Sequence, residues 1–196
     1  MTIMVVEGPN GAGKTTLARA LAQKIDGEVI RPFAPKDNVG FHWGNGSELE
    51  ERLESYEIPY NTHVEDFVIA DFLGKVQISK PIILDRSAPS SLVYGSIRLG
   101  SPKEEKEFID FWANLLPKET IYVFLDVDYE TAQNRLRDST RPGIPIYNAK
   151  EFGEIREKYL AIENMLDSER SYVLDTSGEL GMYTALLDMN YLITDL

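Results

Sequence analysis

The chain has 196 residues, 43% hydrophobic and 27% charged, a balance typical of one folded α/β domain and not of a disordered chain. It carries 20 Lys and Arg against 32 Asp and Glu, and this net charge of −12 argues against nonspecific nucleic-acid binding. Cysteine is absent and only two histidines occur, which excludes disulfides, thiolate metal sites and histidine-rich metal centres.

Strands and helices are predicted to alternate along the chain. The predicted strands are residues 3–6, 28–31, 81–85, 120–126 and 172–175. The predicted helices are near residues 14–27, 47–57, 61–79, 89–98, 102–115, 128–138 and 179–193, with a further amphipathic helix whose apolar stripe is Phe152, Ile155, Tyr159, Ile162 and Leu166. This alternation predicts a doubly wound, mainly parallel sheet, in which a ligand lies beyond the carboxyl ends of the strands.

The first predicted strand runs directly into a phosphate-binding loop. Residues 8–15 match the pattern G-x-x-x-x-G-K-[ST] at each fixed position, and an amphipathic helix follows. Glycines let successive backbone N–H groups curl around a phosphate, while the lysine reaches the β- and γ-phosphates and the hydroxyl ligates Mg²⁺. The predicted ATP-binding residues are Asn10, Gly11, Ala12, Gly13, Lys14, Thr15 and Thr16.

Two later strands each end in an aspartate, Asp85 and Asp126, and either carboxylate is a candidate for holding Mg²⁺ beside the loop. Asp85 is the stronger candidate, because Arg86 follows it and an arginine there can bridge donor and acceptor phosphates. Asp126 is expected to begin the capping turn of the next helix, where Asp128 can serve as the cap.

The chain resembles the thymidylate kinase branch of the P-loop nucleotide kinases. The resemblance rests on residues 7–16, on residues 85–90 (Asp-Arg-Ser-Ala-Pro-Ser) and on an arginine-rich segment after the fourth strand. The second motif is also similar to the Asp/Glu-Arg-Ser motif of deoxynucleoside kinases. In either family the resemblance implies a P-loop kinase fold with five parallel strands in the order 2-3-1-4-5. It also implies a mobile lid over the phosphates, here at about residues 135–150.

Arg135, Arg137 and Arg141 fall where the resemblance places lid arginines. Their guanidinium groups would stabilise the charge that phosphoryl transfer spreads over the equatorial oxygens. The family often carries an arginine within the phosphate loop, whereas this loop has Asn10 and Gly11, so the lid must supply the charge. Three surface arginines at a charged helix end are the alternative interpretation. The resemblance also places residues 175–178 near adenine, although a plain turn accounts for them equally.

The acceptor is indicated by Arg31 at the end of the second strand. A cation there suits an acceptor that already bears a phosphate, whereas deoxynucleoside kinases usually have an acid nearby. The base-reading positions depart from thymidylate kinase, since the expected arginine falls at Phe72, the expected stacking aromatic at Val68, and an expected glutamine at Gly95. Aromatic residues at this spacing also fit core packing. The predicted acceptor-binding residues are Arg31, Phe33, Phe67, Asp71, Phe72, Arg86, Ser90 and Tyr94.

The sequence therefore predicts an ATP- and Mg²⁺-dependent deoxynucleoside monophosphate kinase of one domain, residues 1–196. The predicted catalytic residues are Lys14, Asp85, Arg86, Arg135, Arg137 and Arg141, with Thr15 and Asp85 at the metal. A deoxynucleoside kinase, a kinase acting on a base in DNA and a non-catalytic NTP-binding module remain open alternatives. The expected partner is a small deoxynucleotide substrate. The expected location is the cytoplasm, because the sequence shows neither a secretory signal nor a membrane span. A homodimer is compatible with the apolar helix surface.

Overall fold

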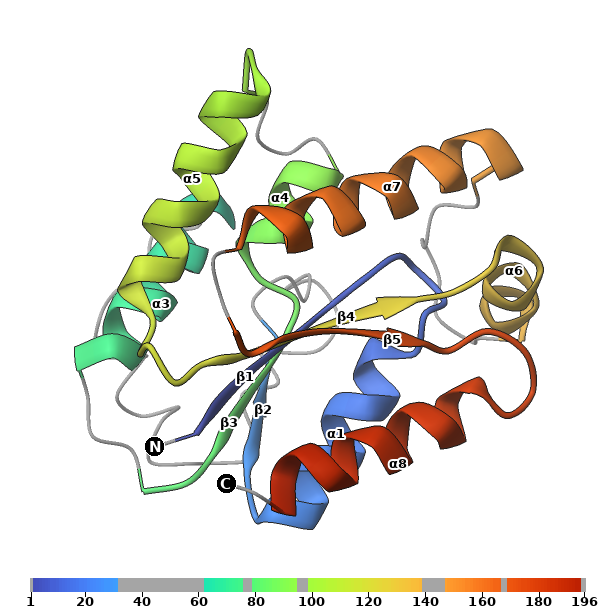
Figure 1. Cartoon of the computed structure of the whole chain (residues 1–196), viewed down its shortest axis with the longest axis horizontal. Helices are drawn as coiled ribbons and strands as arrows, with labels where there is room; N and C mark the ends of the chain where they lie inside the picture. Colours follow the sequence, from blue (N-terminus) through green and yellow to red (C-terminus); the bar gives the residue numbers. More distant parts are fainter. Residues whose placement is uncertain are drawn as a thin grey trace.

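The computed structural model describes residues 2–31, 62–75, 79–94, 99–138, 147–166 and 169–194. Five strands form one parallel sheet in the order β2-β3-β1-β4-β5, which confirms the predicted order (Figure 1). The strands are β1 (Ile3–Glu7), β2 (Glu28–Ile30), β3 (Ile82–Asp85), β4 (Ile121–Asp126) and β5 (Ser171–Asp175). The helices are α1 (Lys14–Ile25), α3 (Thr62–Lys75), α4 (Ala88–Val93), α5 (Pro102–Leu115), α6 (Tyr129–Arg137), α7 (Ala149–Met165) and α8 (Gly181–Thr194). The predicted helix at 47–57 lies outside the described residues.

The central strand β1 is buried along its whole length. It pairs with β3 on one side, where Ile3 lies opposite Ile82, and with β4 on the other, where Met4 lies opposite Ile121. A strand that is covered on both faces has no solvent-facing positions, and this explains the continuous apolar run at residues 3–6. The sheet therefore holds the start of the phosphate-binding loop at its centre.

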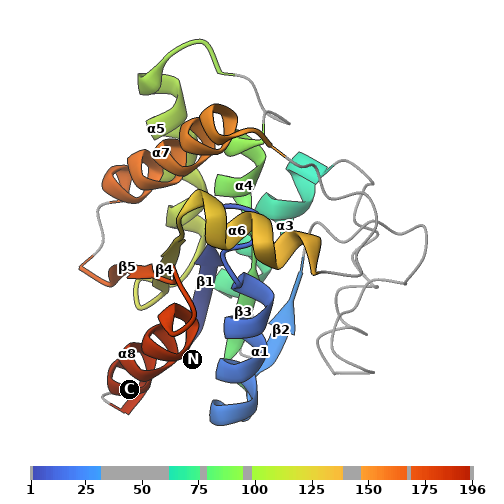
Figure 2. The ribbon, with the colours of Figure 1, turned by 90° about the vertical axis from the view of Figure 1, so that its right-hand side faces the viewer.

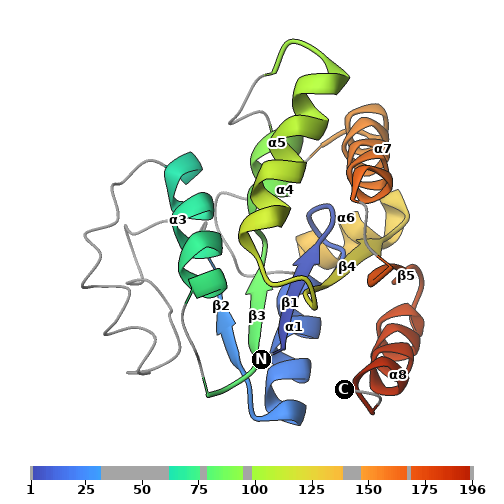
Figure 3. The ribbon, with the colours of Figure 1, turned by 60° about the vertical axis from the view of Figure 1, so that its left-hand side comes forward.

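Alternate residues of the strands point into two separate cores, one on each face of the sheet. Met4 and Val6 pack with α1 and α8, whereas Ile3 and Val5 pack with α3, α4, α5 and α7. In Figure 1, α1 and α8 lie below the strands and α4, α5 and α7 above them, and Figure 3 separates α3 and α5 from α8 in the same way. This two-sided cover is what the predicted doubly wound architecture requires.

Helix boundaries follow the capping chemistry of the sequence. Asp128 caps α6 as predicted, because its side chain accepts a hydrogen bond from the Thr131 N–H at 2.8 Å. Asn148 and Glu151 form a reciprocal capping box at the start of α7. The predicted apolar stripe of α7 is buried along its whole length. Among the described residues, no helix is long and apolar enough to cross a membrane.

Candidate active site

The phosphate-binding loop joins β1 to α1 at the carboxyl edge of the sheet, and Figure 2 shows α6 lying beside this turn. Gly11 has φ +84°, and a Cβ there would lie 2.6 Å from the Ala132 carbonyl oxygen, so a side chain is excluded. Gly13 has φ +93° and precedes α1 without any side-chain cap, which leaves the first N–H groups of the helix directed at the loop. A helix start of this kind binds phosphate oxygens.

Lys14 lies inside the loop that it closes. Its Nζ donates hydrogen bonds to the carbonyl oxygens of Gly8, at 2.6 Å, and Pro9, at 2.7 Å. Burial lowers the pKa of Lys14 well below its usual value, and the positive charge of Arg86 lowers it further, while Asp85 and Glu7 oppose the shift. A phosphate in the loop would replace both carbonyl oxygens with negatively charged partners and so stabilise the charged lysine.

Thr15 and Asp85 meet across the carboxyl edge of the sheet. The Thr15 hydroxyl donates to Asp85 Oδ2 at 2.7 Å, and Asp85 is 1% exposed, with no hydrogen-bond partner at its Oδ1 within the described part of the chain. A hydroxyl beside an orphaned carboxylate oxygen fits Mg²⁺, which takes few protein ligands and completes its shell with phosphate oxygens and water. The residues present therefore fit the metal that the sequence predicts.

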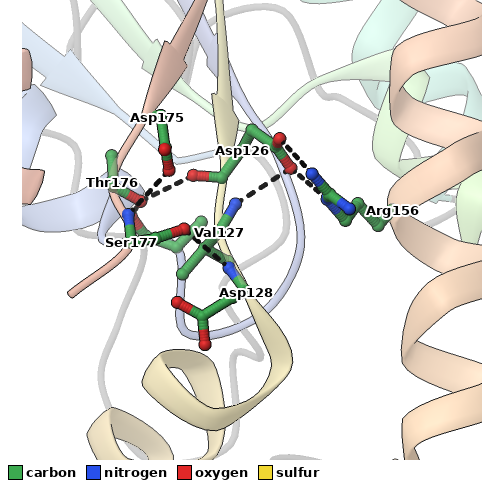
Figure 4. Close-up of polar contacts among 8 residues, drawn as sticks. Asp126, Val127, Asp128, Arg156, Asp175, Thr176 and Ser177 are labelled. Carbon is green, nitrogen blue, oxygen red and sulfur yellow. Dashed lines mark hydrogen bonds and ion pairs between the residues drawn. The ribbon is translucent and has the colours of Figure 1, made fainter.

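Asp126, the other candidate for the metal, has a different partner. Arg156 of α7 binds its carboxylate in a bidentate ion pair, with Nη2 at 2.6 Å from Oδ2, and this contact raises the pKa of Arg156 (Figure 4). Asp126 also accepts a hydrogen bond from the Val127 N–H, while Asp128 fills the cap position of α6. The expected capping role of Asp126 is thus secondary to its pairing with Arg156.

Arg86 directs its guanidinium group towards the phosphate-binding loop. It donates to Asn10 Oδ1 and, at 3.2 Å, to the Ser90 hydroxyl, and its Cζ lies 5.2 Å from the ring centroid of Tyr94. The Tyr94 hydroxyl in turn accepts from the Asn10 backbone N–H at 3.0 Å. Three residues from the two predicted motifs, Asn10, Arg86 and Ser90, are therefore brought into one cluster together with Tyr94.

Arg135 lies between the phosphate-binding loop and the turn after β5. Its guanidinium donates to the carbonyl oxygens of Gly11 at 3.3 Å, Thr176 at 2.7 Å and Gly178 at 3.2 Å. Burial lowers the pKa of Arg135, although Asp128 opposes the shift. The sequence groups this residue with Arg137, but Arg137 is exposed and contacts Asn134 at 3.3 Å.

The turn after β5 is tied to the same edge of the sheet. The Thr176 hydroxyl contacts the carbonyl oxygens of Ala12, at 3.0 Å, and Asp126, at 2.9 Å. The Ser177 hydroxyl accepts from the Asp128 N–H at 2.9 Å, as Figure 4 shows. Thr176 is fully buried and links the phosphate-binding loop to the ends of β4 and β5. The sequence pattern alone gave no signal for this role.

On the acceptor side, Arg31 lies beside Asp85, with its Nε 3.8 Å from Oδ2, and remains 32% exposed at its side chain. Asp71 forms an ion pair with Lys75 one turn along α3. Phe72 is 3% exposed and packs in the core on the α3 side of the sheet. This core packing explains why an aromatic residue occurs at position 72, and it requires no contact with the acceptor. Phe33 and Arg141 lie outside the described residues, as does the side chain of Phe67.

Two further residues were missed by sequence reasoning. Glu7 is fully buried at the end of β1, and Tyr159 of α7 is 2% exposed. The signal for Glu7 is a single acid after four apolar residues of a buried strand, which points to a paired charge. Tyr159 occupies a position in the apolar stripe, where its hydroxyl gives no separate signal.

Comparison with protein families and comparison with individual proteins both point to thymidylate kinases. A profile described as thymidylate kinase matches residues 6–184. A thymidylate kinase of Xanthomonas euvesicatoria pv. vesicatoria is 30% identical over 186 residues, covering 90% of this chain and 77% of that protein. The fold is similar to that of the YorR protein from Bacillus subtilis in complex with phosphorylated GDP (TM-score 0.61, 18% identity, 98% of this chain and 95% of that one). It is also similar to that of a deoxyadenosine kinase from M. mycoides (TM-score 0.58, 21% identity, 100% of both chains).

Proposed function

The chain belongs to the thymidylate kinase family, and from this premise we propose that it transfers the γ-phosphoryl group of ATP to a deoxynucleoside 5′-monophosphate. Thymidylate kinases are nucleoside monophosphate kinases, so the chain is a phosphotransferase that yields a nucleoside diphosphate. One observation carries the choice of acceptor: Arg31 places a cation 3.8 Å from Asp85, next to Arg86. One guanidinium group beside the carboxylate proposed to hold the metal and a second, that of Arg86, beside the phosphate-binding loop at Asn10 suit an acceptor that arrives with its own phosphate.

The donor side of the proposed reaction is built on the loop. Lys14 and the backbone N–H groups of residues 10–16 bind the ATP phosphates, and Thr15 and Asp85 hold Mg²⁺. When bound, the metal neutralises negative charge on the β- and γ-phosphates. Arg86 contacts both the donor and the acceptor phosphate, while Arg137 and Arg141 act from the lid at about residues 135–150. These groups together orient the phosphates and stabilise the charge of the transferring group.

The transfer needs no general base in this proposal. The second pKa of a phosphate monoester is about 6, so an acceptor oxygen is already ionised near neutral pH. A nucleoside 5′-hydroxyl, in contrast, must lose its proton to a carboxylate or another base. Arg31 and Tyr94 are proposed to bind the phosphate and sugar of the acceptor, and residues Phe33, Phe67 and Asp71 are proposed to contact the base. The predicted acceptor residue Ser90 is buried, and its hydroxyl already has partners in Glu7, Tyr159 and Arg86, so it supports the site from behind. We further propose that the enzyme acts in the cytoplasm, where its nucleotide substrates occur, and a homodimer stays a prediction.

The experiment that tests this function measures ADP release with ATP and Mg²⁺ against deoxynucleosides and their 5′-monophosphates, with each of the common bases. We expect turnover with monophosphates only. Arg31→Gln is expected to raise the KM for the monophosphate and leave the KM for ATP unchanged. Turnover with nucleosides alone would favour a deoxynucleoside kinase, and ATP binding without turnover of any acceptor would favour a DNA substrate or a non-catalytic binding module.

Arg135 is expected to act on ATP binding. Replacement by alanine removes the contacts that hold Gly11 and the 176–178 turn together, so the KM for ATP should rise roughly tenfold, as for the loss of one charged hydrogen bond. The KM for the monophosphate should stay at the wild-type value. Arg19→Ala, which removes an exposed arginine of α1 that has no role in the proposed site, is the matched comparison and should leave both KM values unchanged. An unchanged KM for ATP in Arg135→Ala would contradict this role.

A further inference from the structure

Glu7 is a buried acid that the proposed transfer does not use. It is the last residue of β1 and is fully buried. Its Oε1 accepts hydrogen bonds from the Ser87 N–H at 2.6 Å and the Ser87 hydroxyl at 2.9 Å, and its Oε2 accepts from the Ser90 hydroxyl at 2.7 Å. Three donors directed at one carboxyl group match the acceptor-only, ionised form of glutamate. Burial raises the pKa of Glu7, while the hydrogen bonds from Ser90 and Ser87 and the positive charge of Arg86 oppose that shift. The hydrogen-bond geometry itself fits a carboxylate that accepts from all three donors.

The direction of each hydrogen bond around Ser90 follows from this arrangement. The Ser90 hydroxyl has one proton, and Glu7 Oε2 receives it. The Tyr159 hydroxyl lies 2.9 Å from Ser90 Oγ and must therefore donate to it, as Arg86 also does at 3.2 Å. Burial raises the pKa of Tyr159 well above its usual value, so the tyrosine remains a donor. Glu7 is thus the final acceptor of a chain of hydrogen bonds. The chain runs from the Tyr159 hydroxyl on α7 to the Ser90 hydroxyl, which also accepts from Arg86, and from Ser90 to the Glu7 carboxylate.

The backbone of Arg86 depends on the same carboxylate. Arg86 has φ +82°, a left-handed conformation that is strained for a residue with a side chain and persists only where the surroundings impose it. Its own N–H donates to the Val6 carbonyl oxygen at 3.1 Å, and the following N–H, that of Ser87, donates to Glu7. Two consecutive peptide groups are therefore fixed by two consecutive residues of β1.

We propose that Glu7 is a positioning residue for phosphoryl transfer, which holds Arg86 in its left-handed conformation and thereby directs the guanidinium group at the transferring phosphate. This inference rests on the proposed function of the site. The carboxylate acts at two points, on the backbone through Ser87 and on the guanidinium through Ser90. A misplacement of about 1 Å in such a group can slow a reaction about 10²-fold.

The test is a double-mutant cycle between Glu7 and Arg86. Glu7→Gln keeps the shape of the side chain but removes the charge and turns one acceptor into a donor facing Ser90. We expect it to lower kcat about 10²-fold with no change in the KM for ATP. In an Arg86→Ala background, the same substitution should have no further effect on kcat, because the group that Glu7 positions is already missing.

A second variant tests the same inference if Glu7→Gln does not fold. Ser87→Ala removes one of the three donors and should lower kcat about tenfold, again only when Arg86 is present. Thr120→Val is the matched control, because Thr120 is also buried but directly precedes β4 at the opposite, amino-terminal edge of the sheet, where its hydroxyl has no hydrogen-bond partner among the described residues. It should leave kcat unchanged even if the melting temperature falls.

The possible outcomes separate this inference from the proposed function. If the wild-type protein phosphorylates no nucleoside monophosphate, the proposed function is wrong and the cycle has no basis. If the wild-type protein turns over and Arg86→Ala slows it, but the Glu7 and Ser87 variants keep wild-type kcat, the inference alone is wrong. Equal losses of kcat in both Arg86 backgrounds would also overturn it, because Glu7 would then act independently of Arg86.

Discussion

Lys14→Ala is expected to lower kcat for ADP formation by about 10³-fold. The amine is the one cationic group of the loop that reaches the β- and γ-phosphates in the proposed complex. Its Nζ donates hydrogen bonds to the Gly8 and Pro9 carbonyl oxygens, so the amine is held within the loop. The assay is coupled ADP release with saturating monophosphate. Lys24→Ala, an exposed lysine in the last turn of the same helix, is the matched control and should keep wild-type kcat.

The same variant has a second expected effect, on stability. Because burial lowers the pKa of Lys14, the unfolded chain binds this proton more tightly than the folded chain. The contribution of Lys14 to folding is therefore least favourable at low pH and improves as the pH rises through the lowered pKa towards 10.5. We expect nucleotide-free Lys14→Ala to melt no lower than the wild type at neutral pH. A clear fall in its melting temperature would show that the loss of activity reflects unfolding.

Asp85→Asn is expected to shift the Mg²⁺ requirement of the reaction upwards by about 10- to 100-fold and to lower kcat at fixed Mg²⁺ by a similar factor. The substitution preserves shape but removes the negative charge beside Thr15, and it places an amide at one of the two oxygens. A Mg²⁺ titration of ADP release at constant ATP measures both effects.

The matched control is the aspartate at the end of the neighbouring strand. Asp126→Asn removes a carboxylate that is paired with Arg156, so it should leave the Mg²⁺ dependence unchanged. Arg156 is 46% exposed, and solvent screening limits the pair to about 1 kcal/mol, or about 2–4 °C in melting temperature. If Asp126→Asn shifts the Mg²⁺ dependence as far as Asp85→Asn, the assignment of the metal to β3 is wrong.

The sequence predicts those parts of the site whose function depends on residues that are close together along the chain. The phosphate-binding loop needs its glycines and lysine at fixed spacing, because the backbone itself binds phosphate. The buried strands are recognised by their unbroken apolar runs. Asp85 and Arg86 were found because they directly follow such a strand. These features depend on neighbours along the chain and need no knowledge of the tertiary structure.

The remaining features depend on contacts between distant residues. Glu7 and Ser90 are 83 positions apart, and Ser90 and Tyr159 are 69 apart, so no spacing rule connects them. Arg135 and Arg137 look equivalent in the sequence, but two residues are about half a turn of helix, so the side chains lie on opposite faces and only Arg135 contacts the Gly11 carbonyl oxygen. Phe72 shows the opposite ambiguity, since a core residue and a base-stacking residue follow the same helical spacing.

The strand order also bears on how the chain is made. β1 precedes β3 and β4 in the chain and is synthesised before them, yet it lies between these two strands in the sheet. At a synthesis rate of about 5–20 residues per second, about 6–24 s pass between the emergence of residue 7 and that of residue 126. Until then the apolar strand lacks at least one neighbour and is open to chaperones. The phosphate-binding loop, which directly follows β1, is consequently expected to become ordered only after β4 has been synthesised.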